Sequence, residues 1–142
     1  MEISLVRKRV RQCIEHAHTS AAARRDANRE AAAAWERLLA QAAVPLVQQI
    51  AQVLKAEGQA FRVETPAGRV RLVSERSADD HIELALDTTG QVPVVVGAVN
   101  RTRGRERVSD EHILASGADI ASLEDERLLE FFTGVLGPFV ER

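Results

Sequence analysis

The first 57 residues form an alanine-rich stretch of helical character, and the segment from Ser4 to Ala43 contains neither proline nor glycine. A helix of that length spans about 60 Å, at 1.5 Å per residue. A compact domain with about as many residues as this chain is only about 30 Å across. The helix must therefore overhang, fold back on itself or pack against another chain. Each outcome indicates assembly or interaction more than an enclosed active site.

Small and apolar side chains recur along this stretch from Val10 to Ala42 at intervals of four and three residues, the spacing of a coiled-coil seam. Arg24 and Asn28 occupy the two polar positions in it. Either Asn28 fixes the register of paired helices, or the stripe lapses there. The pattern predicts that residues 1–57 are an oligomerisation segment, through which the chain forms a homodimer. The expected interface residues are Val10, Ile14, Ala17, Ala21, Ala31, Trp35 and Leu38.

Pro45 interrupts the helical pattern, because its ring clashes with the preceding turn and the residue before it avoids the helical region. A second apolar run follows, and Gly58 then suits the position just after a helix end. We expect the helix either to kink or to break and fold back near Pro45.

From Ala60 onwards apolar and polar residues alternate, which is the period of a strand. We expect strands at residues 60–64, 69–72, 81–86 and 92–98, with a possible fifth at 105–108. Short polar turns between them predict a four- to five-stranded antiparallel meander with one apolar and one charged face. Pro93 lacks an N–H group, so the fourth strand is expected at an edge. The remainder of residues 101–121 is expected to be an ordered loop.

A broad apolar stripe from Leu128 to Val140 predicts a C-terminal helix that covers the apolar face of the sheet. Gly137 and Pro138 should bend or end that helix. It lacks the lysine and arginine clusters that flank interfacial helices, so no membrane contact is expected. The fold class is therefore α+β, with a helical segment at 1–57 and a sheet plus closing helix at 58–142.

Four arginines, Arg101, Arg103, Arg105 and Arg107, fall within seven residues. On one strand they would share a face, and Gly104 would let a phosphate approach the backbone. Two interpretations stay open. The segment binds a partner or a phosphate, including a nucleic-acid backbone, or it is solubilising charge paired with acidic residues. No aromatic residue lies among the arginines, so base stacking is not indicated.

The remaining composition offers little chemistry. The chain has 19 basic and 21 acidic residues, a balance that does not favour nucleic-acid or membrane binding by the whole chain. The runs 79–81 and 110–112 have the composition of metal ligands but not three or four converging positions. We expect no catalytic residue, no metal and no cofactor. Cys13 is the single cysteine, which suits a reducing cytoplasm, and no apolar run is long enough to span a membrane.

These features favour a non-enzymatic interaction or assembly protein. We expect it to be homodimeric through its N-terminal helices and to present a charged sheet face and the Arg-rich segment to another protein. The alternative is a nucleic-acid-binding accessory protein that uses Arg101–Arg107. An enzyme is the third and least supported interpretation, because no coherent set of catalytic residues is present.

Overall fold

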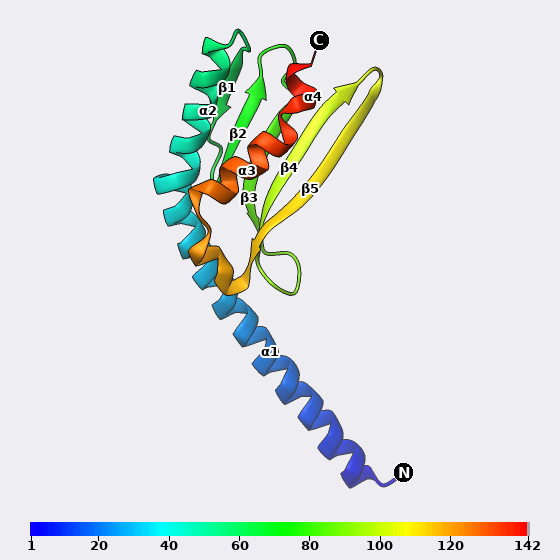
Figure 1. The fold of residues 1–142 in the computed structure, drawn as a ribbon. Coiled ribbons are helices and arrows are strands. Elements are labelled where there is room, and N and C mark those ends of the chain that lie inside the picture. Colours follow the sequence, from blue (N-terminus) through cyan, green and yellow to red (C-terminus); the bar gives the residue numbers. More distant parts are fainter. Residues whose placement is uncertain (142) are drawn as a thin grey trace.

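The structure, a computed structural model, describes residues 1–141 and has an α+β fold in two layers (Figure 1). A five-stranded antiparallel sheet forms one layer. The C-terminal half of the long helix and the C-terminal helices form the other. The predicted fold class is confirmed.

In chain order the helical elements are α1 (Ile3–Leu38), the π-helical turn η1 (Leu39–Ala43), α2 (Val44–Ala56), the 3₁₀ helix η2 (Gly117–Ser122), α3 (Asp125–Val135) and α4 (Gly137–Val140). The strands are β1 (Phe61–Glu64), β2 (Arg69–Ser74), β3 (His81–Asp87), β4 (Val94–Arg103) and β5 (Glu106–Ser116).

The first three helical elements form one continuous helix, because the residues on both sides of η1 keep right-handed helical backbone angles. Pro45 does not end it, so the expectation of a chain that folds back there is wrong. In a regular α-helix the proline ring would clash with the carbonyl group four residues earlier. The wider π turn directly before Pro45 relieves that clash. The predicted irregularity is therefore an insertion of one residue into a turn.

The π turn also changes which side chains face the core. Because it adds one residue, the buried positions after it come one residue later than a regular helical stripe predicts. Ala43 is fully buried, whereas Ala42, which continues the predicted spacing, is only half-buried. Val47 and Ile50 carry the buried side on into α2.

The five strands pair in chain order and every neighbouring pair is antiparallel, which confirms the predicted meander. β4 lies between β3 and β5, so the expectation that Pro93 marks an edge strand is wrong. Pro93 comes just before β4 begins, where its missing N–H group removes no ladder hydrogen bond. Its carbonyl group instead accepts a hydrogen bond from the Gly117 N–H at 2.9 Å.

Residues 101–116, which the sequence predicts to be mostly loop, form the outer part of the β4–β5 hairpin. β5 is an edge strand, and Leu114 is its only buried residue. A strand with little buried surface needs no apolar alternation. This explains why only residues 105–108 gave a strand signal.

The core lies between the sheet and the helices. Its fully buried members from the sheet include Val70, Leu72, Ile82, Leu84 and Val95, and from the helices Val47, Leu128 and Phe132. α3 crosses the inner face of the sheet, as predicted, and the helix stops and restarts at the Gly137-Pro138 step (Figure 1). The closing helix is thus confirmed.

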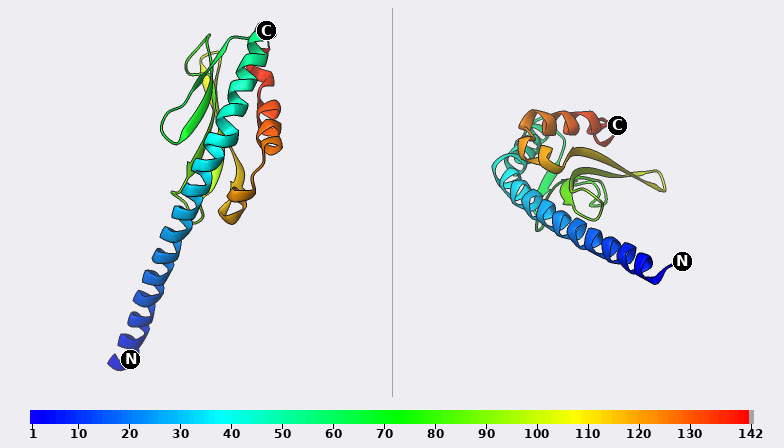
Figure 2. Two further views of the ribbon diagram at one scale, coloured as in Figure 1. Left: turned by 90° about the vertical axis from the view of Figure 1, so that its left-hand side faces the viewer. Right: turned by 90° about the horizontal axis from the view of Figure 1, so that it is seen from below.

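The N-terminal half of α1 extends beyond this body (Figure 2). No residue from Met1 to Glu30 is buried, and Ala31 is the first that is. We call residues 3–26 the overhang. Of the outcomes expected for a helix of this length, the single chain adopts the overhanging one.

Candidate interaction surfaces

The overhang carries an exposed apolar stripe. Val10 and Ile14 are 51% and 48% exposed, and Ala17 and Ala21 follow at the predicted spacing. Ala17 lies eighteen residues, about five turns, before Trp35, so the stripe continues the side of the helix that faces the body. Ile3 and Val6 are also exposed and extend it towards the N-terminus.

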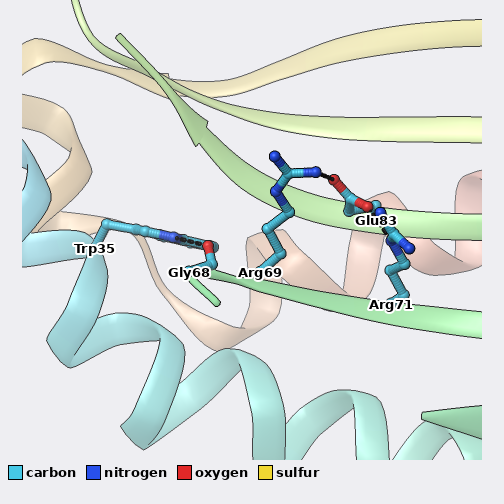
Figure 3. A network of polar contacts seen from close by, with 5 residues as sticks. All are labelled: Trp35, Gly68, Arg69, Arg71 and Glu83. Carbon is cyan, nitrogen blue, oxygen red and sulfur yellow. Dashed lines mark hydrogen bonds and ion pairs between the residues drawn. The ribbon is translucent and has the colours of Figure 1, made fainter. Parts of the chain in front are cut away.

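The second half of the predicted interface is occupied by the chain itself. Ala31 and Trp35 are only 5% and 3% exposed, and Leu38 packs against the same core. The indole Nε1–H of Trp35 donates a hydrogen bond of 2.9 Å to the carbonyl of Gly68, in the turn between β1 and β2 (Figure 3). Ala31, Trp35 and Leu38 thus contact the chain's own core. The predicted interface residues that remain uncovered are those of the overhang: Val10, Ile14, Ala17 and Ala21.

The alanine pattern around Ala31 has an intramolecular use. Ala27, Ala31 and Ala34 of the helix border one small cavity together with Gly117, Ala118 and Ala121. Small residues let η2 approach the long helix closely. The sequence could not distinguish this contact from one between two chains, because both require the same small side chains at the same spacing.

The Arg-rich segment is the tip of the β4–β5 hairpin. Arg103 pairs with Glu106, which leaves Gly104 and Arg105 as a two-residue turn. Gly104 has a φ of +64°. Among the described residues, only glycines have a positive φ. A positive φ at the first turn position alone defines a type II′ turn, which suits the twist of a hairpin. Gly104 is therefore a requirement of the turn.

The expectation that the four arginines share one strand face is wrong. Arg101 and Arg103 point to one side of β4, whereas Arg107 pairs with Thr102 and lies on the opposite side. Arg105 is in the turn. A hairpin returns the chain along a neighbouring strand, so spacing of two residues does not continue through its turn.

Carboxylates from the loop between β2 and β3 contact this tip. Arg107 Nη2 lies 3.1 Å from Asp79 Oδ2. Oδ1 of Asp80 accepts hydrogen bonds from the backbone N–H and the hydroxyl of Thr102, at 2.8 and 2.9 Å. One face of the tip is therefore partly neutralised within the chain, and the face of Arg101 and Arg103 is the more basic one.

The outer face of the sheet is charged, as predicted. Glu83 of β3 forms ion pairs with Arg71 and, at 3.5 Å, with Arg69, both of β2 (Figure 3). Arg62 and Glu64 of β1 form a further pair at 3.1 Å. The Glu83 side chain is 12% exposed, so this network is partly shielded from water.

A groove that the sequence did not reveal lies between the edge strand β5 and α3. It is a shallow depression, open to solvent, with a volume of about 600 Å³, and it is lined by Ile113–Ser116, by η2 and by the first turns of α3. Its charged lining residues are Asp119, Glu124, Glu126, Arg127 and Glu130. The acidic start of α3 was visible in the sequence, but the edge strand opposite it was not.

Other chemistry is sparse in residues 1–141. No group of three or more His, Cys, Asp or Glu side chains is placed to hold a metal ion. Hydrogen bonds from the hydroxyl and then the backbone N–H of Thr89 lower the pKa of the Asp87 carboxyl from its ordinary value of 3.8. Cys13 is a free, exposed thiol on the overhang. None of the helices described has both the length and the apolar character needed to cross a bilayer.

Comparison with protein-family models, with curated proteins and with solved structures finds no match to this chain.

Proposed function

We propose that this chain is a non-enzymatic assembly protein that pairs with a second copy through the apolar stripe of its overhang. The observation that carries the proposal is the exposure of that stripe on a helix with no buried residue before Ala31. Apolar residues at heptad spacing on an isolated helix are satisfied by a second helix. On a solitary helix the Val and Ile side chains stay in water, so they contribute no free energy from burial.

The composition of the stripe fits close pairing. Ala17 and Ala21 let two helices approach to the short end of the usual separation of about 8–10 Å. Val10 and Ile14 then supply most of the apolar area that pairing removes from water. The affinity of the pair should therefore depend on Val10 and Ile14, and its geometry on the alanines.

Asn28 adds a second argument. Its Oδ1 atom is buried where the overhang meets the body and has no hydrogen-bond donor among the described residues. An unpaired buried acceptor is costly. An asparagine in a coiled-coil seam commonly pairs with its counterpart and fixes the register. In the proposed dimer, the amide of Asn28 in the second copy supplies the missing donor.

The experiment is the solution mass, measured by light scattering on a sizing column at low and high salt. We expect a salt-resistant species of about twice 15.6 kDa. Ala21→Glu should give the monomer mass with unchanged circular dichroism, because a close-packed seam has no room for a long charged side chain. Ala23→Glu, on the opposite side of the overhang, is the matched control and should leave the dimer intact. A monomeric wild-type chain, or a dimeric Ala21→Glu variant, would contradict the proposal.

The second candidate is a nucleic-acid-binding accessory protein. The projection of an arginine-bearing hairpin tip beyond the helical layer favours it (Figure 1). Replacement of Arg101 and Arg103 by alanine should then abolish a salt-dependent gel shift with duplex DNA or RNA. Replacement of Arg107, which is paired with Asp79, should matter less. Absence of any shift at low salt would remove this candidate.

The proposed partners are thus a second copy of this chain and another protein that contacts the charged sheet face. We place the protein in the cytoplasm, since a reducing compartment suits the exposed free thiol of Cys13.

A further inference from the structure

The geometry points to a second binding surface, independent of the dimer: the groove between β5 and α3 takes an extended basic peptide segment as an added strand. β5 has no neighbouring strand on its outer side within residues 1–141. Alternate residues of such an edge turn their N–H and C=O groups outwards, ready to pair with another extended chain.

Most of this edge is protected against such pairing, but the part in the groove is not. Charged residues follow one another along its first half, namely Glu106, Arg107, Asp110 and Glu111. Charges of this kind prevent edge-to-edge association. The last four residues, Ile113–Ser116, carry no charge, and Ile113 is 64% exposed. The unprotected stretch of the edge is the one that lines the groove.

A bulge at Leu114 marks the same stretch. Val96 pairs with Ile113 and Val95 with Ala115, so Leu114 is the extra residue. Bulges increase the local twist of a strand and redirect its side chains. The bulge sets a limit on the site, because it favours a short segment over a long strand.

The charge of the groove selects the occupant. Four carboxylates, from Asp119, Glu124, Glu126 and Glu130, line it with a single guanidinium, that of Arg127. Glu126 and Glu130 are one helical turn apart, about 6 Å along α3. Side chains two residues apart on a strand are separated by about 6.6 Å. Lysine or arginine at alternate positions of an added strand would therefore face both glutamates.

The probe that tests this is a fluorescein-labelled eight-residue peptide in which lysine and valine alternate. Its binding to the full chain is followed by fluorescence anisotropy at low salt. We expect saturable binding, and no binding of the peptide in which glutamate replaces lysine. Glu126→Lys combined with Glu130→Lys should weaken binding about tenfold or more, because it reverses the charge that faces the peptide.

Two controls separate strand pairing from simple charge attraction. Asp125→Lys adds the same charge to α3 as either glutamate substitution made alone, but Asp125 does not line the groove. This variant should retain affinity within about twofold, whereas Glu126→Lys and Glu130→Lys, each made alone, should both weaken binding. Methylation of alternate peptide N–H groups keeps the charge and removes the donors, and should abolish binding. Equal binding of the methylated peptide, absence of binding by the lysine peptide, or unchanged affinity of the double variant would each overturn the inference. Because Ala21→Glu leaves the groove intact, its effect on mass is read separately.

Discussion

Phe131 of α3 packs so closely over Gly97 of β4 that a β-carbon at position 97 would lie 2.7 Å from both Cε atoms of the ring. The same ring contacts His112 of β5 edge-on, with 5.5 Å between ring centroids. Gly97 pairs with His112 across the two strands. The missing side chain at position 97 therefore fixes where the closing helix crosses the sheet.

Gly97→Ala should destabilise the protein by about 1–3 kcal/mol, because the aromatic ring or the helix backbone must move to accept a methyl group in a packed core. Chemical denaturation followed by circular dichroism measures the change. Gly90→Ala is the matched control, since its nearest atom would be the Val92 carbonyl oxygen at 3.9 Å. Equal stability of Gly97→Ala and wild type would show that Phe131 moves freely.

Trp35→Phe should cost about 1–3 kcal/mol, because it leaves the Gly68 carbonyl without its donor and removes part of a ring that is 3% exposed. The hydrogen bond that this substitution removes connects the long helix to the turn between β1 and β2. Trp35 is the single tryptophan, so its fluorescence reports unfolding of the wild type, and circular dichroism must be used for the variant. A stability equal to that of wild type would mean that the hydrogen bond contributes nothing net.

The sequence predicted most of the fold because the helices and the first three strands bury one regular face. Leu72, Ile82 and Leu84 lie on such a face, and so does the helical stripe that ends in Phe132 and Val135. The β5 strand escaped prediction because its residues are mostly exposed, so no alternation was required of them. Pro93 led to the wrong prediction of an edge strand. The sequence does not distinguish a proline just before a strand from one inside it, and Pro93 lies one residue before β4.

The candidate surfaces were harder to predict than the elements. Ala31 and Ala21 both lie on the seam of the seven-residue pattern, yet only Ala31 meets the chain's own η2. Which half of the seam is left uncovered depends on where the sheet and the C-terminal helices pack along the long helix. That position is set by tertiary contacts and leaves no pattern in the local sequence. The groove beside Ile113 likewise requires two segments that are separate in sequence.

Ala31→Glu and Ala21→Glu should therefore have different consequences. A glutamate at position 31 would be forced into a buried contact, so it should lower the free energy of unfolding by about 3 kcal/mol or more. The same change at position 21 should alter only the association state. Denaturation midpoints and solution mass, measured on both variants, separate folding from pairing. Equal denaturation midpoints for the two variants would contradict this division.

Glu83→Gln should destabilise the sheet by about 1 kcal/mol, because it removes the shared carboxylate partner of Arg69 and Arg71 on a partly shielded surface. Added salt should reduce the difference between variant and wild type, since it screens exposed ion pairs. Glu64→Gln, whose pair with Arg62 is about 40% exposed on both sides, should cost less. A larger loss at Glu64 would contradict the ranking by exposure.

The Asp87 carboxyl should titrate below its ordinary value of 3.8, because the Thr89 hydroxyl and N–H stabilise the charged form. A pKa that is lowered in the folded state contributes stability above the unfolded pKa and loses it as the pH falls through the folded pKa. Thr89→Val removes the hydroxyl bond, so the carboxyl pKa should rise towards 3.8. The variant should be less stable than the wild type at neutral pH, and this difference in the free energy of unfolding should shrink in acid, where the Asp87 carboxyl is protonated in both proteins. Carbon-detected NMR titration measures the midpoint, with Thr88→Val as the control, and an unchanged Asp87 midpoint in Thr89→Val would refute this cause.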